Sequence, residues 1–274
     1  DKKYSKRKEE LLRLDNICRK KCNLPLRSHN SPQPWALEKT ANEHTLRLKF
    51  VIESETEVRE PYIALEDAES TGIVLNGERV KSDICGWYVD KAIQKVRLPS
   101  IRKGKNILEL SLPFGANTNV EWCYLLGDFG VSLRGSKVKV TQLPEKLQFT
   151  DITQQGLPFY GGKITYVTEF DGNGKNANVI VPEFKAALVE AATTETKEIA
   201  FSPYQAELPT EKGKTKLKLT AYISRQNAFG PVHIRYADKL RISPRNYYPI
   251  GLLYIRRYVL SPAGILSVPE IKLE

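Results

Sequence analysis

The spacing of apolar residues changes along this chain from a helical period to a strand-like one. Over residues 5–22, leucines, an isoleucine and two cysteines recur every three or four positions between basic residues, which predicts an amphipathic helix. Pro25 and the Ser-, Asn- and Pro-rich stretch 28–34 predict the end of this helix and a linker. From residue 35 onward the pattern alternates between apolar and polar positions, as it does in half-buried strands.

Short alternating segments separated by turn residues fill the chain up to residue 144. Asn76-Gly77 lies between two such segments and is a strong hairpin signal. The expected strands are 45–52, 61–65, 72–75, 78–80, 95–98, 106–112 and 124–133. Many short strands at this spacing are typical of a β-sandwich or barrel.

The same pattern resumes beyond residue 145. Residues 163–170 alternate without interruption and lead into a turn-rich loop at 171–176. The other expected elements are strands at 179–182, 186–189, 216–223 and 252–260, and one short helix near 190–196. The chain is therefore expected to be all-β apart from its first helix and this short one.

A short internal repeat predicts that the strands form two related modules. The segment 103–110 (KGKNILEL) recurs as 212–219 (KGKTKLKL). Each copy follows a strand with aromatic residues and precedes an asparagine-containing loop: Trp87, Tyr88, Asn117 and Asn119 flank the first copy, and Tyr204 and Asn227 the second. We therefore predict an N-terminal helix and linker (1–34) and two antiparallel β-sandwich modules (35–144 and 145–274).

Composition and charge exclude some classes of protein. The chain has 274 residues and a net charge of +10, but residues 1–30 alone hold ten Lys or Arg and four acids, which leaves the rest nearly balanced. A nucleic-acid-binding domain usually carries its basic residues on the folded body, so no nucleic-acid partner is predicted. No apolar run approaches the roughly 20 residues that span a bilayer, and no signal-peptide core is seen, so no membrane partner is predicted and the compartment is left open.

The cysteines and the missing methionine give weaker indications. Cys18 and Cys22 face the same side of the expected helix, but no second pair of ligands completes a metal site, so free thiols are expected for them and for Cys85 and Cys123. The sequence contains no Met, even at position 1. We therefore expect this chain to be a piece of a longer polypeptide.

Several segments resemble a known group of proteins. The runs 63–68 (IALEDA), 76–80 (NGERV) and 103–109 (KGKNILE) resemble the galactose-binding-like jelly rolls attached to glycoside hydrolases, which carry an NG-x-x-V hairpin and a later x-x-G-x-N-x-L/I strand entry. The runs 121–129, 156–166, 227–231 and 262–266 resemble the accessory region of large bacterial glycoside hydrolases of the family 2 and rhamnosidase type. The resemblance implies two jelly-roll modules, with the catalytic domain on an upstream part of the same polypeptide.

Candidate binding residues follow from the chemistry of sugar recognition. Aromatic rings stack on the apolar faces of pyranose rings, and Asn or Asp side chains bind the hydroxyl groups. Trp87, Tyr160, Asp128 and Asn227 are the candidates here, each competing with a purely structural role. Asp128 follows a glycine in an apolar run, where a carboxylate ties down a loop or, as a second choice, helps bind a structural calcium ion. No cofactor, catalytic residue or transition-metal site is predicted.

The sequence therefore supports one leading function and two alternatives. The first is a non-catalytic accessory region that supports or orients the catalytic domain of a glycoside hydrolase and contacts glycan. The second is an autonomous carbohydrate-binding protein of the lectin or adhesin type. The third is a small glycosidase that uses Asp128 or Glu121 with a second acid, because glycoside hydrolysis needs two carboxyl groups flanking the bond.

Overall fold

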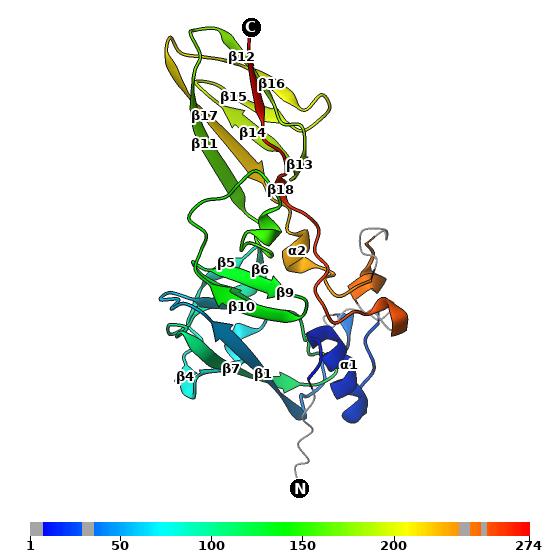
Figure 1. Cartoon of the computed structure of the whole chain (residues 1–274). Helices are drawn as coiled ribbons and strands as arrows, with labels where there is room; N and C mark the ends of the chain where they lie inside the picture. Colours follow the sequence, from blue (N-terminus) through cyan, green and yellow to red (C-terminus); the bar gives the residue numbers. More distant parts are fainter. Residues whose placement is uncertain (1–7, 29–35, 236–241, 248–250) are drawn as a thin grey trace. The chain divides into compact units, whose positions relative to one another are not determined.

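The structure, a computed structural model, describes residues 8–28, 36–235, 242–247 and 251–274 (Figure 1). In this part the chain is mostly β, with several antiparallel sheets and the two α-helices α1 (Leu11–Lys21) and α2 (Gln226–Phe229). Neither helix in the described ranges is long and apolar enough to cross a membrane. The mostly β fold and the N-terminal helix confirm the class predicted from the periodicity.

The chain divides into two compact units. Unit 1 comprises Asp1–Leu143 and Arg241–Arg257, and unit 2 comprises Pro144–Leu240 and Tyr258–Glu274. The sequence analysis placed its module boundary after residue 144 and assigned everything beyond it to the second module. In the structure a late segment of the chain groups with unit 1, as does α1.

Unit 1 contains two sheets. One has six strands in the order β4-β3-β7-β1-β10-β9, and the other has four in the order β5-β6-β2-β8. The strands are β1 (His44–Ser54), β2 (Tyr62–Leu65), β3 (Gly72–Leu75), β4 (Glu78–Val80), β5 (Ile84–Tyr88), β6 (Asp90–Arg97), β7 (Gly104–Phe114), β8 (Tyr124–Leu126), β9 (Gly130–Arg134) and β10 (Lys137–Thr141).

Unit 2 contains three sheets. Their strand orders are β11-β17-β14-β15, β16-β12-β19 and β13-β18. The strands are β11 (Lys163–Asp171), β12 (Asn176–Ile180), β13 (Phe184–Lys185), β14 (Val189–Ala192), β15 (Thr196–Ile199), β16 (Gln205–Pro209), β17 (Lys214–Tyr222), β18 (Gly264–Ile265) and β19 (Glu270–Leu273).

The two units share one strand topology. The order β4-β3-β7-β1 in unit 1 corresponds to β15-β14-β17-β11 in unit 2, and β6-β2-β8 corresponds to β16-β12-β19. The matched strands follow each other in the same sequence order, and every matched pair is antiparallel. The repeated segments 103–110 and 212–219 form the starts of the matched strands β7 and β17, so the sequence repeat lies at equivalent places.

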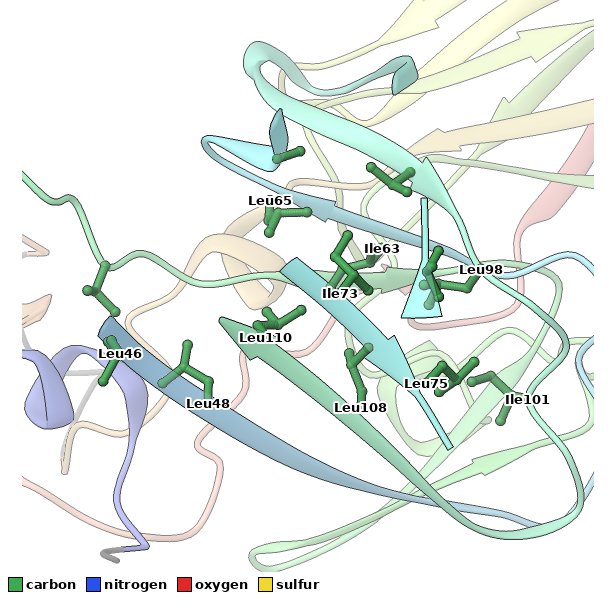
Figure 2. Packing of buried hydrophobic residues seen from close by; sticks show 14 of the residues in the cluster. Leu46, Leu48, Ile63, Leu65, Ile73, Leu75, Leu98, Ile101, Leu108 and Leu110 are labelled. Atoms are coloured by element: carbon green, nitrogen blue, oxygen red, sulfur yellow. The ribbon is translucent and has the colours of Figure 1, made fainter. Parts of the chain in front are cut away.

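Each unit has its own hydrophobic core, built by strand alternation. In unit 1 the inward residues of β1, β3 and β7 meet those of β2 and β6 from the other sheet (Figure 2). The labelled side chains include Leu46, Leu48, Ile63, Leu65, Ile73, Leu75, Leu108 and Leu110. In unit 2 the corresponding strands contribute Val179, Val189, Ala191, Leu208, Leu217 and Leu219.

Helix α1 is held to the strands of unit 1 by a buried arginine, which also forms an ion pair within the helix. Arg19 is almost fully buried, and its Nε donates to both carboxylate oxygens of Asp15, at 2.9 and 3.0 Å. The rest of the guanidinium donates to the carbonyls of Pro25, Ala116 and Thr118. The planar fork of arginine therefore joins the helix, the segment after it and the loop that follows β7.

Four predicted elements differ in the structure. The strand predicted at 124–133 is broken at Gly127 into β8 and β9, which belong to different sheets. The predicted helix near 190–196 is the β14–β15 hairpin, and the strand predicted at 186–189 starts only at its last residue, Val189. Residues 252–260, predicted as a strand, form none of the strands named above, and a 3-10 turn at Gly251–Leu253 covers their start. Short apolar runs do not by themselves separate strands from turns or helices, which accounts for these errors.

Candidate functional site

A pair of glutamates lines a small cavity in unit 1. Glu66 directly follows β2, and Glu121 precedes β8. Glu66 Oε2 accepts from Asn119 Nδ2 at 2.8 Å, and Glu121 Oε1 accepts from the Arg27 guanidinium at 3.4 Å. The cavity, of about 30 Å³, is completed by Leu48, Leu65, Thr71, Leu110, Leu112, Val120 and Cys123.

Burial raises the proton affinity of Glu121. It raises the pKa of Glu121 to about 7; Arg27 opposes the shift and the neighbouring Glu66 adds to it. Arg27 Nη1 also lies 3.9 Å from Asp15 Oδ2, so Arg27 connects Glu121 to the Asp15–Arg19 ion pair. Burial likewise raises the pKa of Asp15, against the lowering effect of Arg19. One electrostatic network therefore extends from α1 to the cavity.

The cavity is too small for glycoside hydrolysis. A space of about 30 Å³ holds one or two water molecules, whereas small-molecule sites usually measure about 300–1,000 Å³. A pyranose ring does not fit in a space of this volume, whereas a two-carboxylate mechanism needs room for the sugar at the site. In this conformation Glu66 ties the end of β2 to Asn119, and Glu121 ties the segment before β8 to Arg27 of the N-terminal segment.

The structure separates Trp87 from Asp128, the two binding candidates of unit 1. Trp87 lies on β5, one edge of the four-stranded sheet, whereas Asp128 follows β8, the opposite edge. Trp87 is 52% exposed, on a strand whose register against β6 is irregular on both sides of it. Asp128 is exposed in the loop between β8 and β9.

Tyr160 and Asn227, the candidates in unit 2, have structural partners. Tyr160 Oη donates to the Lys163 carbonyl at 2.9 Å, and its ring packs closely against Gly162. Asn227 is buried; its Nδ2 donates to the Ser261 carbonyl at 2.8 Å and its Oδ1 accepts from the Ser261 amide at 2.9 Å. These bonds hold the loop after β17, so Asn227 has little left to offer a ligand.

Metal ligands are not gathered in the part of the chain that the structure describes. No group of three or more His, Cys, Asp and Glu side chains there is arranged to hold a metal ion. Cys18, Cys22, Cys85 and Cys123 are free thiols. The expected structural calcium ion has no ligand set among these residues.

Each unit has an exposed aromatic ring near one of the matched strands β6 and β16. Trp87 lies just before β6, and Tyr204, 42% exposed, lies just before β16, the strand matched to β6. Tyr204 packs edge-on against Phe184 at 5.1 Å between ring centroids, and Phe201 lies nearby in the chain and is 86% exposed. Unit 2 thus exposes two aromatic side chains, Phe201 and Tyr204.

Sequence reasoning identified Trp87 as a candidate but did not select Phe201 or Tyr204. The signal was present in the repeat, because Tyr204 precedes the second copy as Trp87 precedes the first. No family model matches the chain, and no curated protein is similar to it. The functional argument therefore depends on the geometry of these two aromatic positions.

Proposed function

We propose that this chain is a non-catalytic, glycan-contacting accessory region of a larger glycoside hydrolase, built from two jelly-roll β-sandwiches of the galactose-binding-like type. The sandwich arrangement is supported by a buried cluster in each unit that draws on more than one sheet. The duplicated topology also fits the two modules that the sequence resemblance implies.

The observation that carries the proposal is an exposed aromatic ring in each unit. Trp87 lies on β5, in the hairpin that leads into β6, and Tyr204 directly precedes β16; each keeps two-fifths or more of its surface exposed. Folding usually buries aromatic side chains, because each removes roughly 150–250 Å² from water. Rings left exposed on the surface of both units are suited to stacking on sugar rings.

Binding to polysaccharides tests the proposal. In affinity gel electrophoresis with a panel of soluble polysaccharides, the wild-type chain should be retarded by at least one of them. Trp87→Ala and Tyr204→Ala should each reduce retardation by roughly tenfold in affinity, the loss of about 1–1.5 kcal/mol of aromatic contact. Val51→Ala serves as the control, because Val51 is 53% exposed but not aromatic.

Other outcomes point to the alternatives. Tight binding to one defined oligosaccharide by this chain alone would favour an autonomous lectin-like protein. Turnover of aryl glycosides by the purified chain, abolished by Glu121→Gln, would favour a small glycosidase. Retardation that both aromatic variants leave unchanged would contradict the proposed binding positions.

A further inference from the structure

Strand β11 lies at a sheet edge in unit 2, whereas its counterpart in unit 1, β1, pairs with β10 at its last residue, Ser54. β11 is nine residues long, and β17 is its neighbour in the sheet order (Figure 1). The matched strand β1 is flanked on the equivalent side by β10 and β9. A long edge strand presents unpaired backbone groups and is a template for another strand.

The orientation of the β11 backbone follows from its ladder. The Ile223 amide donates to the Gly162 carbonyl at 2.9 Å, which makes residue 162 a hydrogen-bonded position against β17. Antiparallel strands alternate between bonded and non-bonded positions, so the odd residues from 163 to 171 direct their amides and carbonyls to the free edge. The bond from Tyr160 Oη to the outward Lys163 carbonyl agrees with this assignment.

The side chains of β11 also alternate. Ile164, Tyr166 and Phe170 pack against the core of unit 2, and Phe149 stacks on Tyr166 below the edge. The odd residues are exposed, with Val167 at their centre and 56% exposed. Among the described residues, one edge-directed backbone group of β11 has a hydrogen-bond partner outside the β11–β17 ladder. It is the Lys163 carbonyl, which accepts from Tyr160 Oη.

We infer that β11 is the contact strand of a symmetric dimer, in which two copies of this chain pair antiparallel about Val167. In this register Val167 opposes its own copy, Thr165 opposes Glu169, and Lys163 opposes Asp171. Each opposed pair exchanges two backbone hydrogen bonds, because the odd residues all face the edge. The exposed valines cover each other, and both ends of the strand bring opposite charges together.

Registers centred on Thr165 or on Glu169 are less favourable than the one centred on Val167. Centring the pair on Thr165 leaves Asp171 beyond the paired stretch and sets Lys163 against Val167. Centring it on Glu169 opposes two glutamates and sets Val167 against Asp171. Like charges directly opposite each other destabilise antiparallel pairs. Charge and hydrophobicity together therefore favour Val167 over Thr165 and Glu169 as the two-fold position.

The test is a concentration series of the full chain by sedimentation velocity. The wild type should show a monomer–dimer equilibrium, with dimer present at tens of micromolar, the weak range expected for a contact of one strand per copy. Val167→Pro should weaken dimerisation by at least about tenfold, since it removes an edge-directed amide and no bond to β17. Val167→Lys should do the same, while Val51→Lys, at the comparably exposed valine of β1, should leave dimerisation unchanged.

A charge reversal distinguishes specific pairing from a damaged fold. Lys163→Asp should weaken the dimer, because it places two acids opposite each other at both ends of the strand. Adding Asp171→Lys should restore the affinity to within a few-fold of the wild type. A chain that stays monomeric at several hundred micromolar would overturn the inference. So would a dimer that survives Val167→Pro, that is lost in Val51→Lys, or that the second charge reversal does not rescue.

Discussion

Glu121, in the cavity of unit 1, makes the stability of the protein depend on pH. Its carboxyl is buried beside Glu66 and bonded to Arg27, and its pKa rises from an ordinary value of 4.5 to about 7. The folded state therefore binds more protons than the unfolded state between these two values. By linkage, this residue makes the protein less stable as the pH rises through that window.

The pH dependence of Glu121→Gln should expose this contribution. At pH 5 the variant and the wild type should have similar free energies of unfolding, since the carboxyl is then mostly protonated in the folded state. At pH 8 the variant should be more stable by about 1–3 kcal/mol, a range discounted for the partial solvent access of the side chain. Urea unfolding at pH 5, 6, 7 and 8 measures the difference.

The control for this experiment is an exposed glutamate. Glu43→Gln should shift the free energy of unfolding by less than about 0.5 kcal/mol at every pH. A Glu121→Gln effect that is the same at pH 5 and pH 8 would show that the carboxyl of Glu121 ionises in the folded state as it does in the unfolded state.

The long strands β7 and β17 start with the same local device. Gly104 and Gly213 have φ angles of +100° and +104°, a region that favours glycine. In each strand, the residue two positions after this glycine has a buried side chain that accepts a hydrogen bond from a backbone amide. Asn106 Oδ1 accepts from the Arg102 amide at 3.0 Å, and Thr215 Oγ1 accepts from the Glu211 amide at 2.9 Å. The repeated sequence thus encodes the turn that enters each long strand.

This equivalence predicts which substitutions Asn106 tolerates. Asn106→Ala should lower the free energy of unfolding by about 1–3 kcal/mol, because it removes the bonds from its buried side chain to the backbone of Arg102 and Gly104. Asn106→Thr should cost less, since a hydroxyl at this position accepts the same amide in unit 2. Chemical denaturation of both variants, with Lys105→Ala as the exposed control, tests the order. A threonine variant as unstable as the alanine variant would argue against equivalent roles.

The sequence predicted elements well where a local signal was strong. The Asn76-Gly77 turn has φ angles of +52° and +87°, as a type I′ hairpin requires, and it joins β3 to β4. The strands around residues 45–52, 106–112 and 163–170 are also confirmed, because their alternation is long and regular. Partners distant in the chain were not predictable, which is why the cavity of Glu66, Asn119 and Glu121 was missed although Glu121 was noted as a candidate acid.

At the scale of the whole molecule, a late segment completes unit 1. The Arg13 guanidinium lies 4.0 Å from the centre of the Tyr254 ring, and Tyr254 Oη donates to Glu9 Oε1 at 3.4 Å. Trp122, which donates to Glu10 at 2.8 Å, lies 6.0 Å from Tyr247 between ring centroids. The apolar run that suggested a strand at 252–260 therefore supplies aromatic contacts to the N-terminal helix region.

Removing one of these contacts should loosen α1 in the full chain. Tyr254→Ala removes both the cation–π contact with Arg13 and the bond to Glu9, which together contribute about 1–2 kcal/mol. Amides of Leu11–Lys21 should then exchange roughly tenfold faster in hydrogen–deuterium exchange, whereas amides of β17 in unit 2 should be unaffected. Leu252→Ala is the matched control in the same segment, because Leu252 is 89% exposed and should change neither rate. If the exchange rates of the α1 amides are unchanged in Tyr254→Ala, the helix is held by Asp15, Arg19 and its apolar face alone. The segment Arg241–Arg257 would then belong to unit 1 without stabilising it.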